Sequence, residues 1–186
     1  MMVPKDAKII IIEGIAGAGK TTLKDQLKEQ FKHKKVYAFS EEEVLFGWKH
    51  IHLKGISSLR FKLHNILLDF IEGKLNEDVL FIIDRFHISL KVLELEEGFD
   101  EEYAKILSRV RKLPVHVVIP TLDRSEIKER VAHKERTEQW TDYLDEKLKL
   151  RGFTDIETMY VSEQQKVLDL AEKQGISFSL HSNRKL

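Results

Sequence analysis

The chain has 186 residues, which is the size of one ordinary domain and is enough to bury a core. Its 31 basic and 31 acidic residues give zero formal net charge, and this balance argues against nucleic acid as a partner, because phosphate backbones select a basic surplus. The absence of cysteine excludes a disulfide framework, a thiolate nucleophile and a cysteine-ligated zinc site.

Five short apolar runs alternate with longer segments of helical periodicity, which is typical of a parallel sheet with crossover helices. The predicted strands are Lys8–Glu13, Val36–Ser40, Val79–Asp84, Val115–Thr121 and Ile176–Leu180. The predicted helices are Lys20–Lys32, Ser57–Ile71, Glu101–Arg111, Arg124–Glu135, Asp142–Leu150 and Glu157–Lys173. The sequence therefore predicts a single α/β domain over residues 1–186, in which ligands bind beyond the carboxyl ends of the strands.

The first apolar run, Ile9 to Ile12, is too short for a membrane span or a signal peptide. With no cysteine in the chain, we expect a soluble, cytoplasmic protein that has no membrane partner.

This strand leads into a segment that matches the phosphate-binding pattern G-x-x-x-x-G-K-[ST], residues 14–21. Its glycines accept backbone angles that let successive N–H groups point at phosphates, and the helix that follows adds the positive end of its dipole. Lys20 is predicted to contact the terminal phosphates, and the Thr21 hydroxyl to bind Mg²⁺. The expected cofactors are ATP and Mg²⁺, and the expected nucleotide-binding residues are Gly14, Ala16, Gly17, Ala18, Gly19, Lys20, Thr21 and Thr22.

Charged residues follow the next two strands. Asp84 closes an apolar run at the place where such proteins keep a carboxylate for Mg²⁺ or its water ligands, and Arg85 would reach the same cleft. Glu41, Glu42 and Glu43 suit a general base or a position near Mg²⁺ if they face that cleft. They equally suit a helix N-terminus, where the dipole stabilises acids.

A cationic group follows the fourth strand. On one continuous helix Arg130, Lys134 and Glu138 share a face, with Arg136 beside it. Such a group of cations suits a triphosphate in its transition state. The alternative is an exposed helix face with ion pairs such as Glu126 with Arg130, which contribute little to stability.

Together these motifs resemble the deoxynucleoside kinase and thymidylate kinase group of P-loop phosphotransferases. The resemblance covers residues 8–150 and rests on E-G-x-x-G-x-G-K-T, then E-x-x-x-x-W at Glu43 and Trp48, D-R at Asp84, and R-x-x-x-K-x-R-x-E from Arg130. It implies a three-layer P-loop NTPase fold, with a five-stranded parallel sheet flanked by helices and a mobile helical lid at about 124–140.

The resemblance also implies roles for individual residues. Glu43 would be the base on a nucleoside 5′-hydroxyl, and the lid cations would steady the transferring phosphoryl group. The catalytic residues so implied are Lys20, Glu43, Arg85, Arg130, Lys134 and Arg136. The acceptor contacts so implied are Glu42, Trp48, Arg60 and His64.

The chain departs from both family patterns. Val44 stands where deoxynucleoside kinases usually carry proline, which leaves open which of the three preceding glutamates is the base. Asp84-Arg85-Phe86 is closer to thymidylate kinases, but those carry an acid in the loop, where this chain has Ala16.

The sequence therefore predicts an ATP- and Mg²⁺-dependent kinase whose acceptor is a nucleoside or a nucleotide. A thymidylate kinase-like enzyme, a regulatory protein that binds ATP without turnover and a kinase of a non-nucleotide alcohol remain alternatives. A homodimer is left open.

Overall fold

The strands and helices were assigned on a computed structural model, which describes residues 3–4, 6–45, 53–93, 98–133 and 137–182. The strands are β1 (Ile9–Ile12), β2 (Lys35–Phe39), β3 (Val79–Asp84), β4 (Val115–Thr121) and β5 (Phe178–Ser182). The helices are α1 (Lys20–Gln30), α2 (Glu41–Leu45), α3 (Ile56–Lys74), α4 (His87–Leu93), α5 (Asp100–Val110), α6 (Arg124–Val131), α7 (Glu138–Arg151) and α8 (Ile156–Gln174).

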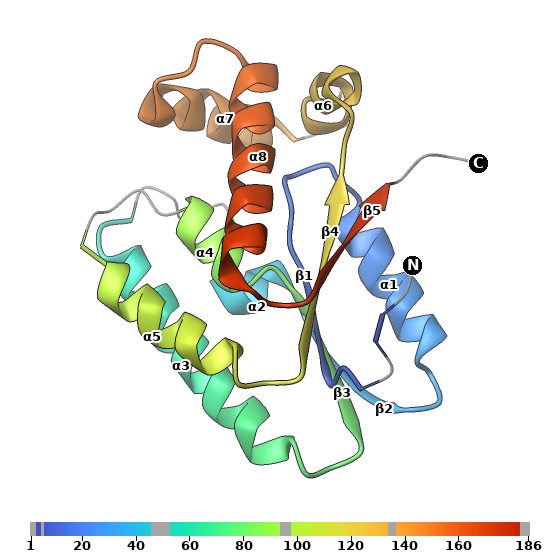
Figure 1. Ribbon diagram of the computed structural model, residues 1–186. Coiled ribbons are helices and arrows are strands. Elements are labelled where there is room, and N and C mark those ends of the chain that lie inside the picture. The colour runs from blue at the N-terminus through green and yellow to red at the C-terminus, as the bar shows by residue number, and fades with distance from the viewer. Residues whose placement is uncertain (1–2, 5, 46–52, 94–97, 134–136, 183–186) are drawn as a thin grey trace.

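The five strands form one parallel sheet in the order β2-β3-β1-β4-β5 (Figure 1), which confirms the predicted fold class. The central strand β1 pairs with β3 on one side and β4 on the other. Ile12 is in register with Asp84, the last residue of β3. The phosphate-binding loop and Asp84 therefore leave the sheet side by side.

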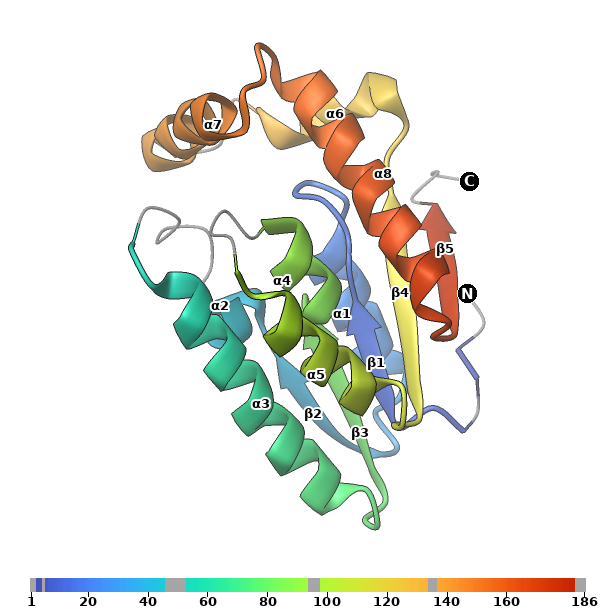
Figure 2. The ribbon, with the colours of Figure 1, turned by 60° about the vertical axis from the view of Figure 1, so that its left-hand side comes forward.

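Alternation along β1 divides the core between the two faces of the sheet. Ile10 and Ile12 pack in a cluster with Leu23 and Leu27 of α1. Ile9 and Ile11 belong to a larger cluster that includes buried side chains of α3, α5 and α8. The sheet consequently lies between α1 on one face and these helices on the other (Figure 2).

A separate apolar cluster lies beyond the carboxyl ends of the strands, where α6 and α7 sit over the sheet (Figure 2). It joins Ile15 of the phosphate-binding loop to Val131 of α6, Trp140 of α7 and Tyr160 of α8. Burial of these side chains holds α6 and α7 close to the loop.

Two short helices, α2 and α4, were missing from the prediction because five to seven residues are too few to show a clear helical period. The helix predicted over 124–135 ends at Val131. There the indole N–H of Trp140 donates to the Val131 carbonyl at 2.8 Å and so caps the end of α6. In the part of the chain that the structure describes, no helix is both long and apolar enough to cross a membrane.

Candidate active site

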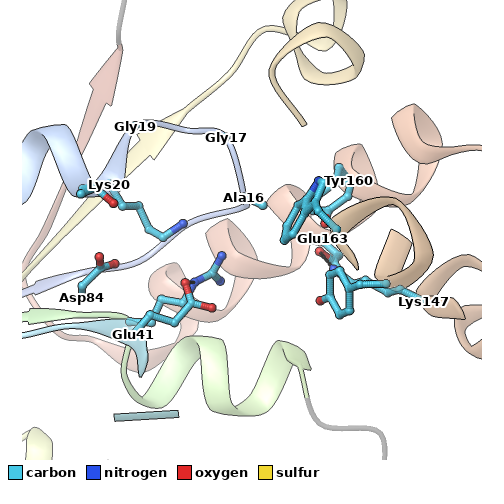
Figure 3. Close-up of a pocket in the computed structure, with 13 residues that line it drawn as sticks. Ala16, Gly17, Gly19, Lys20, Glu41, Asp84, Lys147, Tyr160 and Glu163 are labelled. Carbon is cyan, nitrogen blue, oxygen red and sulfur yellow. Dashed lines mark hydrogen bonds and ion pairs between the residues drawn. The ribbon is translucent and has the colours of Figure 1, made fainter. Parts of the chain in front are cut away.

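A cavity of about 280 Å³ opens at the carboxyl edge of the sheet, between the phosphate-binding loop and helices α7 and α8 (Figure 3). Small-molecule sites usually hold about 300–1,000 Å³, so this cavity has room for the reacting part of a substrate. Its lining combines the loop with the start of α1, the end of β3, the start of α2, and helices α7 and α8: Ala16, Gly17, Gly19, Lys20, Thr21, Glu41, Asp84, Arg85, Trp140, Tyr143, Lys147, Tyr160 and Glu163.

The loop passes so close to its neighbours that two of its positions require glycine. Gly17 has φ +77°, and a Cβ there would lie 3.0 Å from the carbonyl oxygen of Arg130. A Cβ on Gly14 would lie 2.9 Å from the carbonyl oxygen of Pro120. Of the predicted loop residues, Ala16, Gly17, Gly19, Lys20 and Thr21 line the cavity, whereas Gly14, Ala18 and Thr22 are not among the lining residues.

Lys20 is buried at the base of the cavity, where its Nζ donates to the Ile15 carbonyl at 2.9 Å. Burial, together with the charge of Arg85, lowers its pKa to about 8, although Glu41 and Asp84 oppose the shift. A buried ammonium with one neutral hydrogen-bond partner is well placed to bind an anion.

Asp84 is buried next to Lys20, and Lys24 lies 3.8 Å from its Oδ2. Burial raises the pKa of Asp84 against the opposing charges of Lys20 and Arg85. Its Oδ1 is buried and has no hydrogen-bond partner among the described residues. A carboxylate oxygen without a partner is a suitable ligand for a hard cation.

Mg²⁺ fits this corner of the cavity. Thr21 lines the same cavity as Asp84, so one hydroxyl and one carboxylate oxygen are available there. In the described ranges, no three histidine, aspartate or glutamate side chains gather into a metal site. Two protein ligands, one hydroxyl and one carboxylate oxygen, suit Mg²⁺, which usually keeps waters and takes phosphate oxygens as further ligands.

Arg85 reaches into the cavity from an unusual backbone conformation. Its φ is +66°, the one positive value found for a non-glycine residue in the described ranges. Its Nε donates to Glu41 Oε2 at 2.7 Å, and Nη1 lies 3.3 Å from the Ser89 hydroxyl. Strained backbone of this kind is concentrated at functional sites.

Of the three consecutive glutamates 41–43, Glu41 is the one that lines the cavity, and it is also the first residue of α2. Burial pushes its pKa upward, but the charges of Arg85 and Lys20 and the hydrogen bond from Arg85 outweigh burial and hold the pKa below its usual value. Glu41 is therefore ionised at neutral pH.

The structure places Glu43, the predicted catalytic base, outside the lining of the cavity. Glu43 is exposed, and its Oε2 accepts hydrogen bonds from the backbone N–H of Ser40 at 2.6 Å and from the Ser40 hydroxyl at 2.7 Å. This is a capping box at the start of α2. Glu42 is exposed as well and does not line the cavity.

Two of the predicted acceptor contacts lie in the packing of α3, outside the cavity lining. The Nε of Arg60 donates to the Leu45 carbonyl at 2.8 Å, which ties α3 to α2. His64 is fully buried, stacks on Phe86 with the ring centroids 4.4 Å apart, and has its pKa lowered to about 4 by burial. Both positions belong to the buried face of an amphipathic helix.

Arg130 and Glu138, which the sequence predicts to share one helix face, lie on two different helices. Arg130 is in α6 and Glu138 begins α7, and Arg130 pairs with Glu126 at 3.0 Å. Lys134, Arg136 and Trp48 lie outside the described residues.

Sequence reasoning missed the wall that α7 and α8 contribute. Its members are Trp140, Tyr143, Lys147, Tyr160 and Glu163. The sequence did contain a pattern that indicates this wall. The residues from α7 and those from α8 each recur at helical spacing, and each group includes one charged residue on an otherwise apolar face.

No protein-family model matches the chain, and no curated protein matches it. Solved structures do match. The YorR protein of Bacillus subtilis, in complex with phosphorylated GDP, is 19% identical with a TM-score of 0.55, over 94% of this chain and 85% of its own. Thymidylate kinase from Candida albicans is 16% identical with a TM-score of 0.56, over 97% of this chain and 86% of its own. Deoxyadenosine kinase from M. mycoides is 17% identical with a TM-score of 0.49, over 93% and 88%.

The first two likenesses extend over nearly the whole chain. They show that it has a P-loop kinase fold of the kind that the sequence resemblance predicted.

Proposed function

We propose that this protein is a kinase that transfers the terminal phosphoryl group of ATP to a hydroxyl group of a nucleoside. The observation that carries the proposal is the ion pair between Arg85 and Glu41, 2.7 Å long, in the same cavity as the phosphate-binding loop. A hydroxyl acceptor must lose its proton as it attacks phosphorus, and Glu41 is an ionised carboxylate in a position to accept it.

The phosphate-binding end of the cavity would hold the donor. The backbone N–H groups at the start of α1 and the Lys20 ammonium would bind its phosphates. Asp84 and Thr21 would hold Mg²⁺, which neutralises charge on the transferring and leaving oxygens when it is bound. Burial lowers the pKa of Arg85, but the neighbouring carboxylates raise it by more. Arg85 therefore stays charged and can stabilise the transition state.

The charges around the cavity favour a hydroxyl acceptor over a phosphate acceptor. A monophosphate would need a cation on the acceptor side. In the described part of the lining, Arg85 is paired with Glu41, and Lys147 is paired with Glu163 at 2.8 Å. A neutral nucleoside would leave both pairs intact until its hydroxyl meets Glu41.

The acceptor is proposed to belong to the nucleoside and nucleotide class because proteins that share this fold include a thymidylate kinase and a protein solved with phosphorylated GDP. Within that class, the paired charges of the cavity favour the uncharged nucleoside. The base and sugar are open, and a thymidylate kinase-like enzyme with a monophosphate acceptor is the competing assignment.

The test is product formation from ATP and Mg²⁺ with a panel of nucleosides and nucleoside monophosphates. Glu41→Gln should lower turnover by about a hundredfold to ten-thousandfold, which is the usual contribution of a positioned general base. Glu43→Gln is the matched control, because glutamine still completes a capping box, and it should stay within about twofold of the wild type.

Two results would contradict the proposal. Glu41→Gln with wild-type turnover would remove Glu41 from the reaction. Phosphorylation of monophosphates alone, with Glu41→Gln nearly neutral, would give the protein the thymidylate kinase-like activity instead.

A further inference from the structure

At the end of the cavity away from Lys20 and Asp84, a buried ion pair joins α7 to α8 (Figure 3). Lys147 Nζ lies 2.8 Å from Glu163 Oε2, and the two side chains are 2% and 6% exposed. The same ammonium lies 4.3 Å from the ring centroid of Tyr160 and 5.8 Å from that of Tyr143. One carboxylate oxygen and two aromatic faces thus surround the charge of Lys147.

The two side chains that contact Lys147 from α8 have unsatisfied hydrogen-bonding atoms. Glu163 Oε1 and the hydroxyl of Tyr160 are both buried, and neither has a hydrogen-bond partner among the described residues. Both side chains line the cavity. Buried polar atoms are almost always hydrogen-bonded, and a buried ion pair stabilises a fold only when its remaining lone pairs are satisfied. Two such atoms on residues that line one cavity indicate that a bound molecule supplies what they lack.

The chemistry of the missing partner follows from these atoms. Glu163, which faces the ammonium of Lys147, can only accept hydrogen bonds through its second oxygen. The partner must therefore carry an O–H or N–H donor, and a phosphate or carboxylate at this place would be repelled. Tyr143 and Trp140, whose ring centroids are 5.2 Å apart, add aromatic surface on the same wall. Such surface suits a flat or weakly polar ring system.

We propose that Glu163 and Tyr160 form the specificity end of the acceptor site and bind an uncharged O–H or N–H group of the acceptor, away from its reacting hydroxyl. Lys147 is the positioning residue that holds Glu163 in place through their ion pair. This inference rests on the proposed function in taking the acceptor to be a nucleoside. Two parts of a nucleoside carry such a donor, namely a hydroxyl of the sugar and an N–H of the base.

The test measures acceptor binding by calorimetry without ATP, and initial rates with MgATP. The probes are the four common deoxynucleosides, their 2′,3′-dideoxy analogues and analogues methylated on the base nitrogens. Removal of the recognised donor should weaken binding by about tenfold, the usual worth of a hydrogen bond to a charged group. Loss with the dideoxy analogues would assign the sugar hydroxyl, and loss with the methylated analogues would assign the base.

Tyr160→Phe is the sharper variant, because it removes an unpartnered hydroxyl and should leave the melting temperature unchanged or raised. It should raise the acceptor KM by about tenfold while kcat and the KM for ATP stay within twofold. Lys147→Met combined with Glu163→Gln removes the pair without leaving a lone buried charge, and it should also abolish discrimination between each nucleoside and its analogue. Tyr103→Phe is the matched control, since Tyr103 bonds Gln174 outside the cavity, and acceptor binding should not change.

Wild-type acceptor binding in both Tyr160→Phe and the double variant would overturn the inference, as would the failure of any nucleoside to bind the wild type. If nucleosides bind in the predicted way but none is phosphorylated, the proposed kinase activity fails while this binding site stands.

Discussion

Glu13, directly before the phosphate-binding loop, and Ser89, in the first turn of α4, are joined by two hydrogen bonds. Glu13 Oε2 accepts the Ser89 backbone N–H at 3.1 Å and also the Ser89 hydroxyl. Glu13 Oε1 accepts the N–H groups of Phe86 and Ile88, each at 3.0 Å. One fully buried carboxylate thereby fixes the start of the loop against the turn that carries Arg85.

Replacement of Glu13 by alanine should therefore destabilise the fold strongly. Three buried backbone N–H groups would lose their acceptor, at about 1–3 kcal/mol each, so we expect the free energy of unfolding to fall by at least about 3 kcal/mol. Urea unfolding measures this change. Glu29→Ala is the control, because its pair with Lys32 is exposed and should matter little. A loss as small as that of the control would mean that Glu13 does not hold these two segments together.

The pKa of Lys20 predicts how donor affinity depends on pH. Burial lowers that pKa from 10.5 to about 8, so in the ligand-free protein Lys20 gives up its proton as pH rises through about 8. Phosphate binding requires the ammonium, and above this pH the complex must take up a proton. Below about pH 8 Lys20 stays protonated, so its ionisation should not change the affinity for a non-hydrolysable ATP analogue; above that pH the affinity should fall by up to about tenfold per pH unit.

Calorimetry between pH 7 and 9.5 measures this slope. Lys20→Arg keeps a charge at every pH, so its affinity should not decline above about pH 8. Its affinity should be lower throughout, because the guanidinium differs in shape from the ammonium. A wild-type affinity that stays level to pH 9.5 would contradict the assignment of Lys20 to the phosphates.

Asp84→Asn should separate metal binding from stability. Burial holds the pKa of Asp84 above its usual value, which means that its charge is unfavourable in the folded protein. We therefore expect an unchanged or slightly higher melting temperature, together with a rise in the Mg²⁺ concentration needed for half-maximal kinase activity. Asp25→Asn, at an exposed position of α1, is the control. An unchanged Mg²⁺ titration in Asp84→Asn would give Asp84 a structural role.

The sequence was sufficient to predict the sheet and to bring Lys20 and Thr21 to one place, because both depend on local patterns. The bounds of β3 and β4 were predicted to the residue, and Lys20 and Thr21 follow from one contiguous motif. The proposed base was harder to identify, since Glu41, Glu42 and Glu43 differ only in the direction in which a five-residue helix points them. That direction depends on Arg85, which is distant in sequence.

The pairing of charges between α7 and α8 could not be predicted from local patterns for the same reason. Lys147 and Glu163 each stand on a helix whose spacing alone suggests burial, and their pairing depends on how the two helices pack. The break between α6 and α7 likewise comes from a tertiary contact, the bond of Trp140 to the Val131 carbonyl.

Alanine substitutions at Gly17 and Gly175 should separate the effect of backbone strain from the effect of close packing. Gly17 and Gly175 both have positive φ, +77° and +65°, so alanine at either should cost about 1–2 kcal/mol in strain. At Gly175 a Cβ would meet nothing within 4 Å, whereas at Gly17 it would lie 3.0 Å from the Arg130 carbonyl oxygen, at the end of α6. Gly17→Ala must therefore displace either the loop or α6.

We expect Gly17→Ala to weaken binding of a non-hydrolysable ATP analogue by at least about tenfold, since a displaced loop no longer presents its N–H groups to phosphates. Gly175→Ala should lower the melting temperature but leave that affinity within twofold, because it lies at the end of α8, outside the cavity lining. Calorimetry and thermal unfolding on the two variants measure both effects. If the variants lose stability and bind the analogue alike, the loop tolerates a side chain at Gly17, and its approach to α6 is not what shapes the phosphate site.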